Sequence, residues 1–157
     1  RLLVGKWYVQ SEDKVDGTEV MQEINEVFKD DKTCEAKAIS RYKMKDEELD
    51  LYTVVTLEYR LKGHWEIKDK LFTENFNHVE VTVQDVDFEG SDVTADLAQL
   101  KEAKESTKKT AYYEMAVPLK KALLGDVGAV KIKKLNEEQF VVVNKDNTVV
   151  EYKRVAD

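Results

Sequence analysis

The chain has 157 residues, a length usual for one domain, and no stretch rich in Gly, Pro or Ser divides it. Its 25 basic and 32 acidic residues give a net charge of −7, which argues against nucleic acid or an anionic membrane surface as the partner. No apolar run is long enough for a transmembrane segment, and a single cysteine, Cys34, excludes an internal disulfide. We therefore expect a single domain over residues 1–157 that folds on its own core without a metal or other cofactor.

Alternation of apolar and polar residues predicts that most of the chain is β-structure. Between residues 33 and 44 the even positions are apolar or small and the odd ones are mostly polar, which is typical of a strand with one buried face. Short turns that contain Asp or Asn separate such runs. The predicted strands cover residues 3–10, 20–28, 33–44, 51–61, 63–67, 71–88, 127–135, 139–143 and 148–155.

One segment, residues 93–124, is predicted to be helical instead. Ala, Leu, Lys and Glu dominate it, and its apolar residues recur at helical spacing. Because Pro118 lacks the N–H that a helix interior needs, we expect a longer helix that ends near Met115. A short second helix should follow, with Pro118 in its first turn.

Many antiparallel strands with one helical excursion indicate an all-β fold. We expect a closed or nearly closed antiparallel barrel of about eight or nine strands, since closure removes exposed strand edges. The first strand of such a barrel must bend to close one end, and Gly5 permits the bend and a close approach of the backbone. Trp7 lies on the same face, so its ring can cover that end. The same Gly-x-Trp spacing returns at Gly63 and Trp65.

These residues carry a resemblance to a known family. A Gly-x-Trp near the N-terminus, a series of hairpins and Arg154 in the last strand resemble the lipocalin (calycin) pattern, in which that Trp packs against an Arg of the closing strand. The second Gly-x-Trp and the final hairpin look more like the bacterial lipocalin-like domains than like the animal carriers. The resemblance implies a lipocalin-like β-barrel whose closure depends on Gly5, Trp7, Trp65 and Arg154.

The resemblance also implies a location. Bacterial lipocalin-like domains often belong to extracytoplasmic lipoproteins, so we expect the periplasm or cell envelope. The chain starts at Arg1 rather than Met, which leads us to expect a cut or processed chain with a lipid anchor upstream of Arg1. The composition suits a cytoplasmic domain almost as well, and the sequence leaves the oligomeric state open.

The buried face of residues 33–44 bears on function, because every second side chain from 34 to 40 is small. Bulky side chains just fill a barrel of this size, so small ones leave room. One interpretation is a pocket for a small apolar ligand, and the alternative is that Leu97, Leu100 or Tyr112 of the helical segment fills the space. We find no charged residue in the buried rows that would mark a ligand headgroup. The predicted ligand-binding residues are Ala36, Ala38, Ser40, Tyr42, Met44, Tyr59 and Phe72.

No catalytic or metal-binding constellation stands out, and we predict that the chain is not an enzyme. His64 and His78 have no metal-ligand spacing with Cys34 or with each other. Cys34 lies beside alanines on a buried strand face, where a thiol has a raised pKa and is unreactive. Residues 85–96 partly match a Ca²⁺-binding loop, but the pattern fits a strand end and an acidic helix start better.

We therefore prefer two non-catalytic functions over an enzymatic one. The first is a binding module that holds a small hydrophobic molecule in the barrel lumen. The second is a filled barrel that serves as a structural or interaction domain of a cell-envelope lipoprotein.

Overall fold

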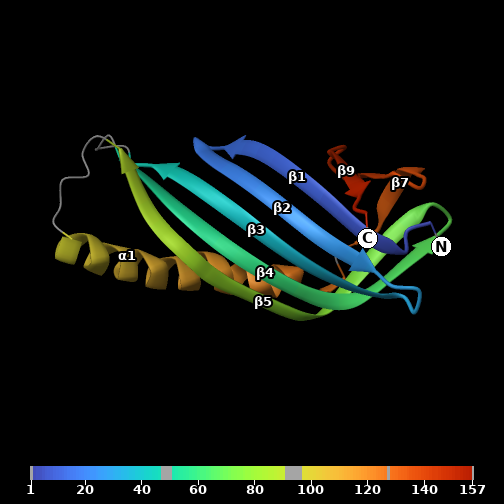
Figure 1. Ribbon diagram of the computed structural model, residues 1–157, viewed down its shortest axis with the longest axis horizontal. Coiled ribbons are helices and arrows are strands. Elements are labelled where there is room, and N and C mark those ends of the chain that lie inside the picture. The colour runs from blue at the N-terminus through green and yellow to red at the C-terminus, as the bar shows by residue number, and fades with distance from the viewer. Residues whose placement is uncertain (1, 47–50, 91–96, 127, 157) are drawn as a thin grey trace.

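The computed structural model describes residues 2–46, 51–90, 97–126 and 128–156 (Figure 1). Eight antiparallel strands form a ring, in the order β1-β2-β3-β4-β5-β7-β8-β9 and back to β1. The long strands are β1 (Gly5–Val15), β2 (Thr18–Phe28), β3 (Thr33–Lys45), β4 (Leu51–Lys68) and β5 (Leu71–Gly90). The short ones are β7 (Val130–Leu135), β8 (Gln139–Val143), β9 (Val149–Arg154) and β6 (Gly125–Asp126), which adds to the edge of β5. The fold is thus barrel-like and mostly β, and the predicted fold class is confirmed.

The ring closes at one end of the molecule. The strands β7 to β9 are 5–6 residues long, whereas β1 to β5 have 11–20 residues and project well beyond them (Figure 1). Two residue pairs make each seam: Trp7 pairs with Arg154 at the β1–β9 seam, and Phe72 pairs with Val130 at the β5–β7 seam. Short seams leave the strands free to diverge on either side of them.

The strand β4 corrects the prediction of two separate strands over 51–61 and 63–67. It is continuous, and its register to β5 shifts between Lys62 and Gly63. A Cβ on Gly63 would lie 1.9 Å from the carbonyl oxygen of Asn75, so only glycine lets the two backbones pass this closely. The glycine therefore marks a β-bulge inside one strand rather than the start of another.

Other strand boundaries also differ from the prediction, most of all the end of β1 and the start of β7. The first strand continues to Val15 and turns into β2 through Asp16 and Gly17, both with positive φ, as the common two-residue hairpin turn requires. The segment predicted as a strand over 127–135 begins at Val130.

The helical segment lies beside β5 (Figure 1). It consists of α1 (Leu97–Ala111), a single π-helical turn η1 (Tyr112–Ala116) and α2 (Val117–Leu123). The expected break near Met115 is absent, since the wider π turn leads directly into α2, with Pro118 in its first turn. Residues 93–96 of the predicted segment lie outside the described residues. Among the helices that the structure describes, none combines the length and apolarity needed to cross a membrane.

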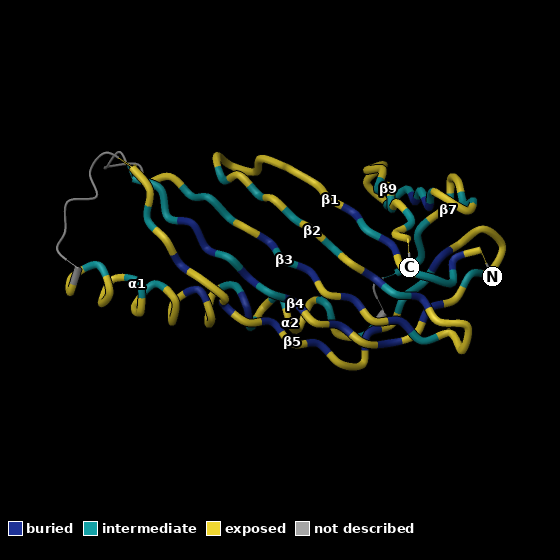
Figure 2. The backbone as a smooth tube through the Cα atoms, in the orientation of Figure 1, coloured by how far each residue is buried: buried dark blue, intermediate teal, exposed yellow. Residues whose placement is uncertain are grey.

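The core occupies the inner face of the ring. Along β3 the even positions from Cys34 to Ser40 are buried, as the alternation predicts. Buried and exposed stretches alternate along the long strands (Figure 2). The helical segment contributes Ala111 and Ala116, which are buried in the same hydrophobic cluster. Tyr112, one candidate for insertion into the lumen, is instead 46% exposed.

Candidate functional site

An arginine and a tryptophan lie against each other where β1 meets β9. The Cζ atom of Arg154 is 4.4 Å from the centroid of the Trp7 ring, and Trp7 is fully buried. The guanidinium also donates hydrogen bonds to the carbonyl oxygens of Val4, at 2.9 Å, and Leu2. Gly5 has a φ of +137°, and a Cβ there would lie 2.3 Å from Nη1 of Arg154. Glycine at position 5 thus leaves the space that the guanidinium occupies.

The second tryptophan packs at the same end of the lumen. Trp65 donates a hydrogen bond from Nε1 to the carbonyl oxygen of Lys29, at 3.1 Å, and meets Phe28 edge to face. Phe140 makes similar edge contacts with Trp7 and Phe72, at centroid distances of 6.0 and 5.1 Å. We call this group the aromatic cluster: Trp7, Phe28, Trp65, Phe72 and Phe140. Both Gly-x-Trp segments therefore supply rings that fill the closed end of the ring.

A cavity of about 720 Å³ lies beside the aromatic cluster, where β1 and β9 diverge. Beyond the seam at Trp7 and Tyr8, β1 continues along β2 while β9 pairs with β8. The cavity is lined by exposed residues such as Glu12 and by buried ones such as Val142, so it reaches from solvent to the core. Its apolar walls are formed by Val9, Ile24, Phe72, Val130, Val142 and Val150.

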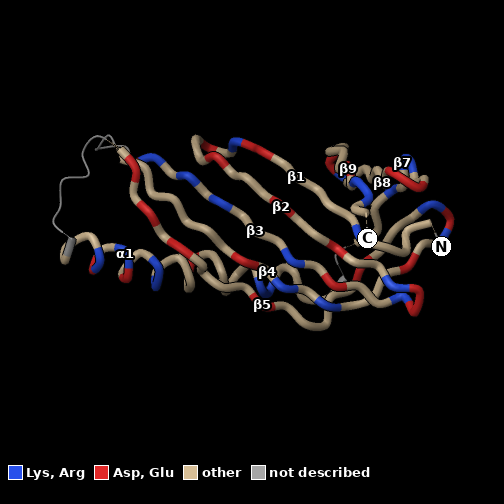
Figure 3. The backbone as a smooth tube through the Cα atoms, in the orientation of Figure 1, with Lys and Arg blue, Asp and Glu red and all other residues tan. Residues whose placement is uncertain are grey.

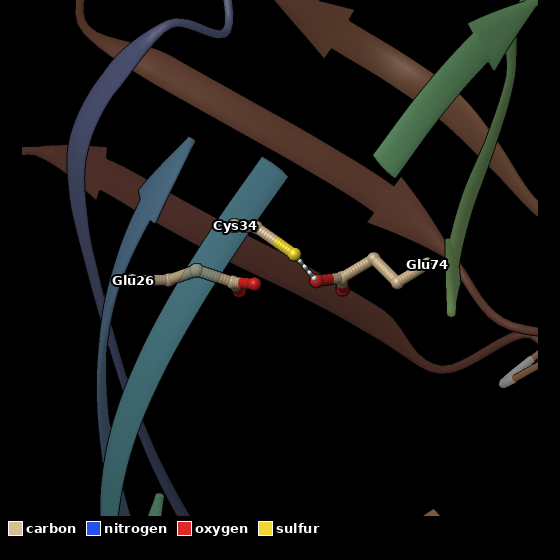
Figure 4. Close-up of side chains that lie close together, drawn as sticks. All are labelled: Glu26, Cys34 and Glu74. Carbon is tan, nitrogen blue, oxygen red and sulfur yellow. Dashed lines mark hydrogen bonds between the residues drawn. The ribbon is translucent and has the colours of Figure 1, made fainter. Parts of the chain in front are cut away.

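Two glutamates meet at the inner end of this cavity; we call Glu26 and Glu74 the acid pair. Glu74 lines the cavity, and Glu26 lies behind it on β2, with only 3% of its surface exposed. Their carboxyl groups face each other next to the thiol of Cys34 (Figure 4). The thiol donates a hydrogen bond to Oε2 of Glu74 at 3.7 Å, whereas Oε2 of Glu26 is buried without a hydrogen-bond partner. One carboxylate oxygen from each glutamate and the Cys34 sulfur lie within 4.8 Å of one another, a spacing that a metal ion could also use.

Burial and mutual repulsion govern the protonation of the acid pair. Burial raises the pKa of Glu26 well above its usual value, and the charge of Glu74 raises it further. Burial also raises the pKa of Glu74, but hydrogen bonds from Glu26 and Cys34 oppose this by stabilising its charge. In the part of the chain that the structure describes, neither carboxyl has a salt bridge to a basic side chain. Glu26 therefore holds the shared proton, and Glu74 presents the charge to the cavity.

The thiol and phenol beside the acid pair stay protonated. Burial raises the pKa of the Cys34 thiol, and the two nearby carboxylates raise it further, so this cysteine is a poor nucleophile, as its strand position suggests. Tyr152 lines the cavity, and burial together with Glu26 and Glu74 raises the pKa of its phenol. Both groups can act as hydrogen-bond donors to a carboxylate but not as bases.

Most of the predicted ligand-binding residues lie outside this cavity. Of the seven, Phe72 alone lines the cavity. The hydroxyl groups of Tyr42 and Tyr59 are 3.0 Å apart on neighbouring strands, further along the lumen. The others are Ala36, Ala38 and Ser40, which are buried on β3, and Met44, which is half-buried near its end.

The acid pair was missed in the sequence, and the statement that the buried rows hold no charged residue is wrong. Glu26 stands between Ile24 and Phe28 on the inner face of β2. Glu74 stands in the same way between Phe72 and Phe76 on β5. A glutamate with large apolar residues two positions before and after it points to the buried face of a strand, and this signal could have identified both.

The weak Ca²⁺-loop match is not a loop in the structure. Asp85, Asp87 and Glu89 lie on the extended strand β5, and Asp96 lies outside the described residues. Asp87 forms a salt bridge with Lys104 of α1 at 3.3 Å. Acidic positions along β5 and basic ones on α1 are visible in Figure 3. Asp87 therefore serves the contact between strand and helix, whereas Glu89 forms a salt bridge with Lys43 of β3 at 3.3 Å.

No protein-family model matches the chain, and no curated protein sequence matches it significantly. The function therefore has to be inferred from the site.

Proposed function

We propose that the protein is a lipocalin-like binding module that holds a small molecule with an apolar body in the cavity between β1 and β9. The observation that carries this proposal is the cavity itself: about 720 Å³, lined about equally by apolar and by polar side chains, and reaching from solvent to the core. Ligand pockets in proteins have volumes of about 300–1,000 Å³ and are mostly apolar with a few polar groups. Burial of the ligand's apolar surface would drive binding.

Family membership and location belong to the same proposal. The contact of Arg154 with Trp7, beside Gly5, is the arrangement expected from the lipocalin resemblance and supports it. We place the protein in the bacterial periplasm or cell envelope, held by a lipid anchor upstream of Arg1, on the strength of that resemblance. The chain acts by binding and not as an enzyme in this proposal, since the thiol in the site is protonated.

A fluorescent apolar probe, N-phenyl-1-naphthylamine, tests binding in the cavity. We expect its emission to rise and saturate at one probe per chain. Val150→Phe places a larger side chain on the cavity wall and should weaken binding by about tenfold, because the ring takes up space that the probe needs.

Val155→Phe is the matched control, because Val155 follows the same strand but is exposed outside the cavity. It should leave the affinity within about twofold. If the probe does not bind, or if both variants bind it as the unchanged protein does, the filled structural or interaction domain becomes the better interpretation.

A further inference from the structure

We propose that the ligand carries a protonated amine, and that this ammonium group binds Glu74 at the inner end of the cavity. This inference rests on the proposed function and names the class of ligand.

The charge of the cavity selects a cation. Its lining includes four acidic residues, Glu12, Asp13, Glu74 and Glu151, and none of the described lining residues is Lys, Arg or His. Glu12, Asp13 and Glu151 are exposed, so they act mainly by attracting a cation toward the cavity, whereas Glu74 is half-buried and its charge is screened less. An anionic ligand such as a fatty acid would be repelled from the same position.

The acid pair lacks a counter-charge that the protein could have supplied. A buried carboxylate is expensive unless a cation or several hydrogen bonds compensate it. Glu74 receives a hydrogen bond from the Cys34 thiol, and Oε2 of Glu26 has no hydrogen-bond partner among the residues that the structure describes. Since both side chains turn toward one point at the end of the cavity (Figure 4), a cation entering from the cavity would meet Glu74 first.

The other groups around that point suit an ammonium ion. An ammonium group has three N–H donors, and it can donate to Glu74 and to the phenolic oxygen of Tyr152, which also lines the cavity. Phe72 and Tyr152 offer aromatic rings to the cation and to the first carbons of the ligand. Glu26 lies behind Glu74, with one carboxylate oxygen of each glutamate and the Cys34 sulfur within 4.8 Å of one another.

A metal ion is the competing occupant of the acid pair. To use the Cys34 sulfur as a ligand it would have to displace the proton of a buried thiol, whereas an ammonium ion binds with that thiol protonated. A single ion would also leave most of the 720 Å³ cavity without a role. The ammonium of a larger molecule accounts for both the charge and the space.

Three probes with one carbon skeleton test the inference: 4-phenylbutylamine, 4-phenylbutanol and 4-phenylbutanoate, each titrated calorimetrically into the full chain at neutral pH. We expect the amine to bind about tenfold or more tightly than the alcohol, and the carboxylate to bind most weakly. The amine's advantage should shrink as the pH falls and Glu74 takes up a proton, whereas the alcohol's affinity should not change.

Matched substitutions test which carboxyl group binds the ammonium group of the ligand. Glu74→Gln should lower amine affinity to that of the alcohol and leave the alcohol within about threefold. Glu26→Gln keeps the shape of the side chain behind Glu74 but cannot ionise, and it should leave amine affinity within about threefold. Glu23→Gln is the control, because Glu23 lies on the exposed face of β2, the strand that carries Glu26. It should leave the affinities for the amine and the alcohol unchanged.

The outcomes separate this inference from the proposed function. If amine and alcohol bind equally, or if Glu26→Gln abolishes amine binding and Glu74→Gln does not, the amine assignment fails while a binding module stands. If neither these probes nor N-phenyl-1-naphthylamine binds, the proposed function fails as well. Tight binding of Zn²⁺ that blocks the amine, and that Cys34→Ser removes, would assign the acid pair to a metal and overturn the inference.

Discussion

The closed end with its aromatic cluster and the cavity with its acid pair are neighbours, but they differ in how the charge in each region is compensated. At the closed end, the guanidinium of Arg154 lies over Trp7 and donates to backbone carbonyls. In the cavity, Glu26 and Glu74 face each other with no basic partner among the described residues. Phe72 belongs to the aromatic cluster and also lines the cavity, so its ring lies where the two regions meet.

The comparison separates a charged group that stabilises the fold, Arg154, from a pair of carboxyl groups that lowers stability, the acid pair. A half-buried charge that donates to backbone carbonyls stabilises the structure, and removing it leaves those carbonyls without their donor. A carboxyl pair without a counter-ion reduces stability when it ionises, and such groups gather at functional sites. Substitutions in the two regions should therefore change stability with opposite signs.

The largest effect is expected where one substitution disturbs both regions. Gly63→Ala would bring a Cβ against the backbone of Asn75, which cannot move without shifting Glu74 on the same strand. We expect a loss of about 3 kcal/mol in the free energy of unfolding, measured by urea denaturation, together with weaker probe binding. Gly17→Ala is the control: its φ is +81°, unlike that of Gly63, but among the described residues no atom lies within 4 Å of its added Cβ, so a loss of about 1 kcal/mol is expected from backbone strain alone. Equal losses would show that close backbone approach is not what requires Gly63.

The next effect should be confined to the closed end. Arg154→Ala removes the contact with Trp7 and leaves the carbonyl oxygens of Leu2 and Val4 without their donor. We expect it to lower the free energy of unfolding by about 2 kcal/mol and to leave probe affinity nearly unchanged.

Arg60→Ala is a suitable comparison for this variant, because Arg60 is an exposed arginine whose partner is Glu58 on the same strand. Its effect should be below about 0.5 kcal/mol. A melting temperature of the Arg154 variant equal to that of the unchanged protein would show that the stack contributes nothing to stability.

Local patterns in the sequence predict most of the strands and the inner face of β3. Alternation is a property of neighbouring residues, and the small side chains from Cys34 to Ser40 follow it without a break. The β4 strand was divided in the prediction because glycine usually interrupts a strand. In the fold, Gly63 permits a close crossing whose partner, Asn75, only the pairing with β5 identifies.

The cavity could not be predicted from local patterns, because it depends on how far two distant strands stay paired. The strands β1 and β9 pair at Trp7 and Tyr8 and then separate, and nothing near either segment fixes that length. The acid pair is different. Alternation places Glu26 and Glu74 on inner faces, but it does not show that they meet, since that requires the register of β2, β3, β4 and β5 together.

The smallest effect, and the one with the opposite sign, is expected from neutralising the acid pair. The pKa of Glu26 is raised in the folded protein above its ordinary value of 4.5, so the folded state binds its proton more tightly than the unfolded state. The stability due to that proton is complete below the unfolded pKa and is lost as the pH rises through the raised folded pKa. Glu26→Gln cannot ionise and escapes this loss. We expect it to melt at about the same temperature as the unchanged protein at pH 5, and about 3 °C higher at pH 8.

The control for this comparison is Glu23→Gln, which removes the same charge from the exposed face of β2. Its melting temperature relative to that of the unchanged protein should be the same at pH 5 and pH 8, because solvent screens an exposed carboxylate in both the folded and the unfolded state. A difference between the Glu26 variant and the unchanged protein that stays constant from pH 5 to pH 8 would mean that Glu26 does not hold the shared proton. A bound ammonium would supply the missing counter-charge. At pH 8, 4-phenylbutylamine should therefore reduce the difference in melting temperature between Glu26→Gln and the unchanged protein, and 4-phenylbutanol should reduce it less.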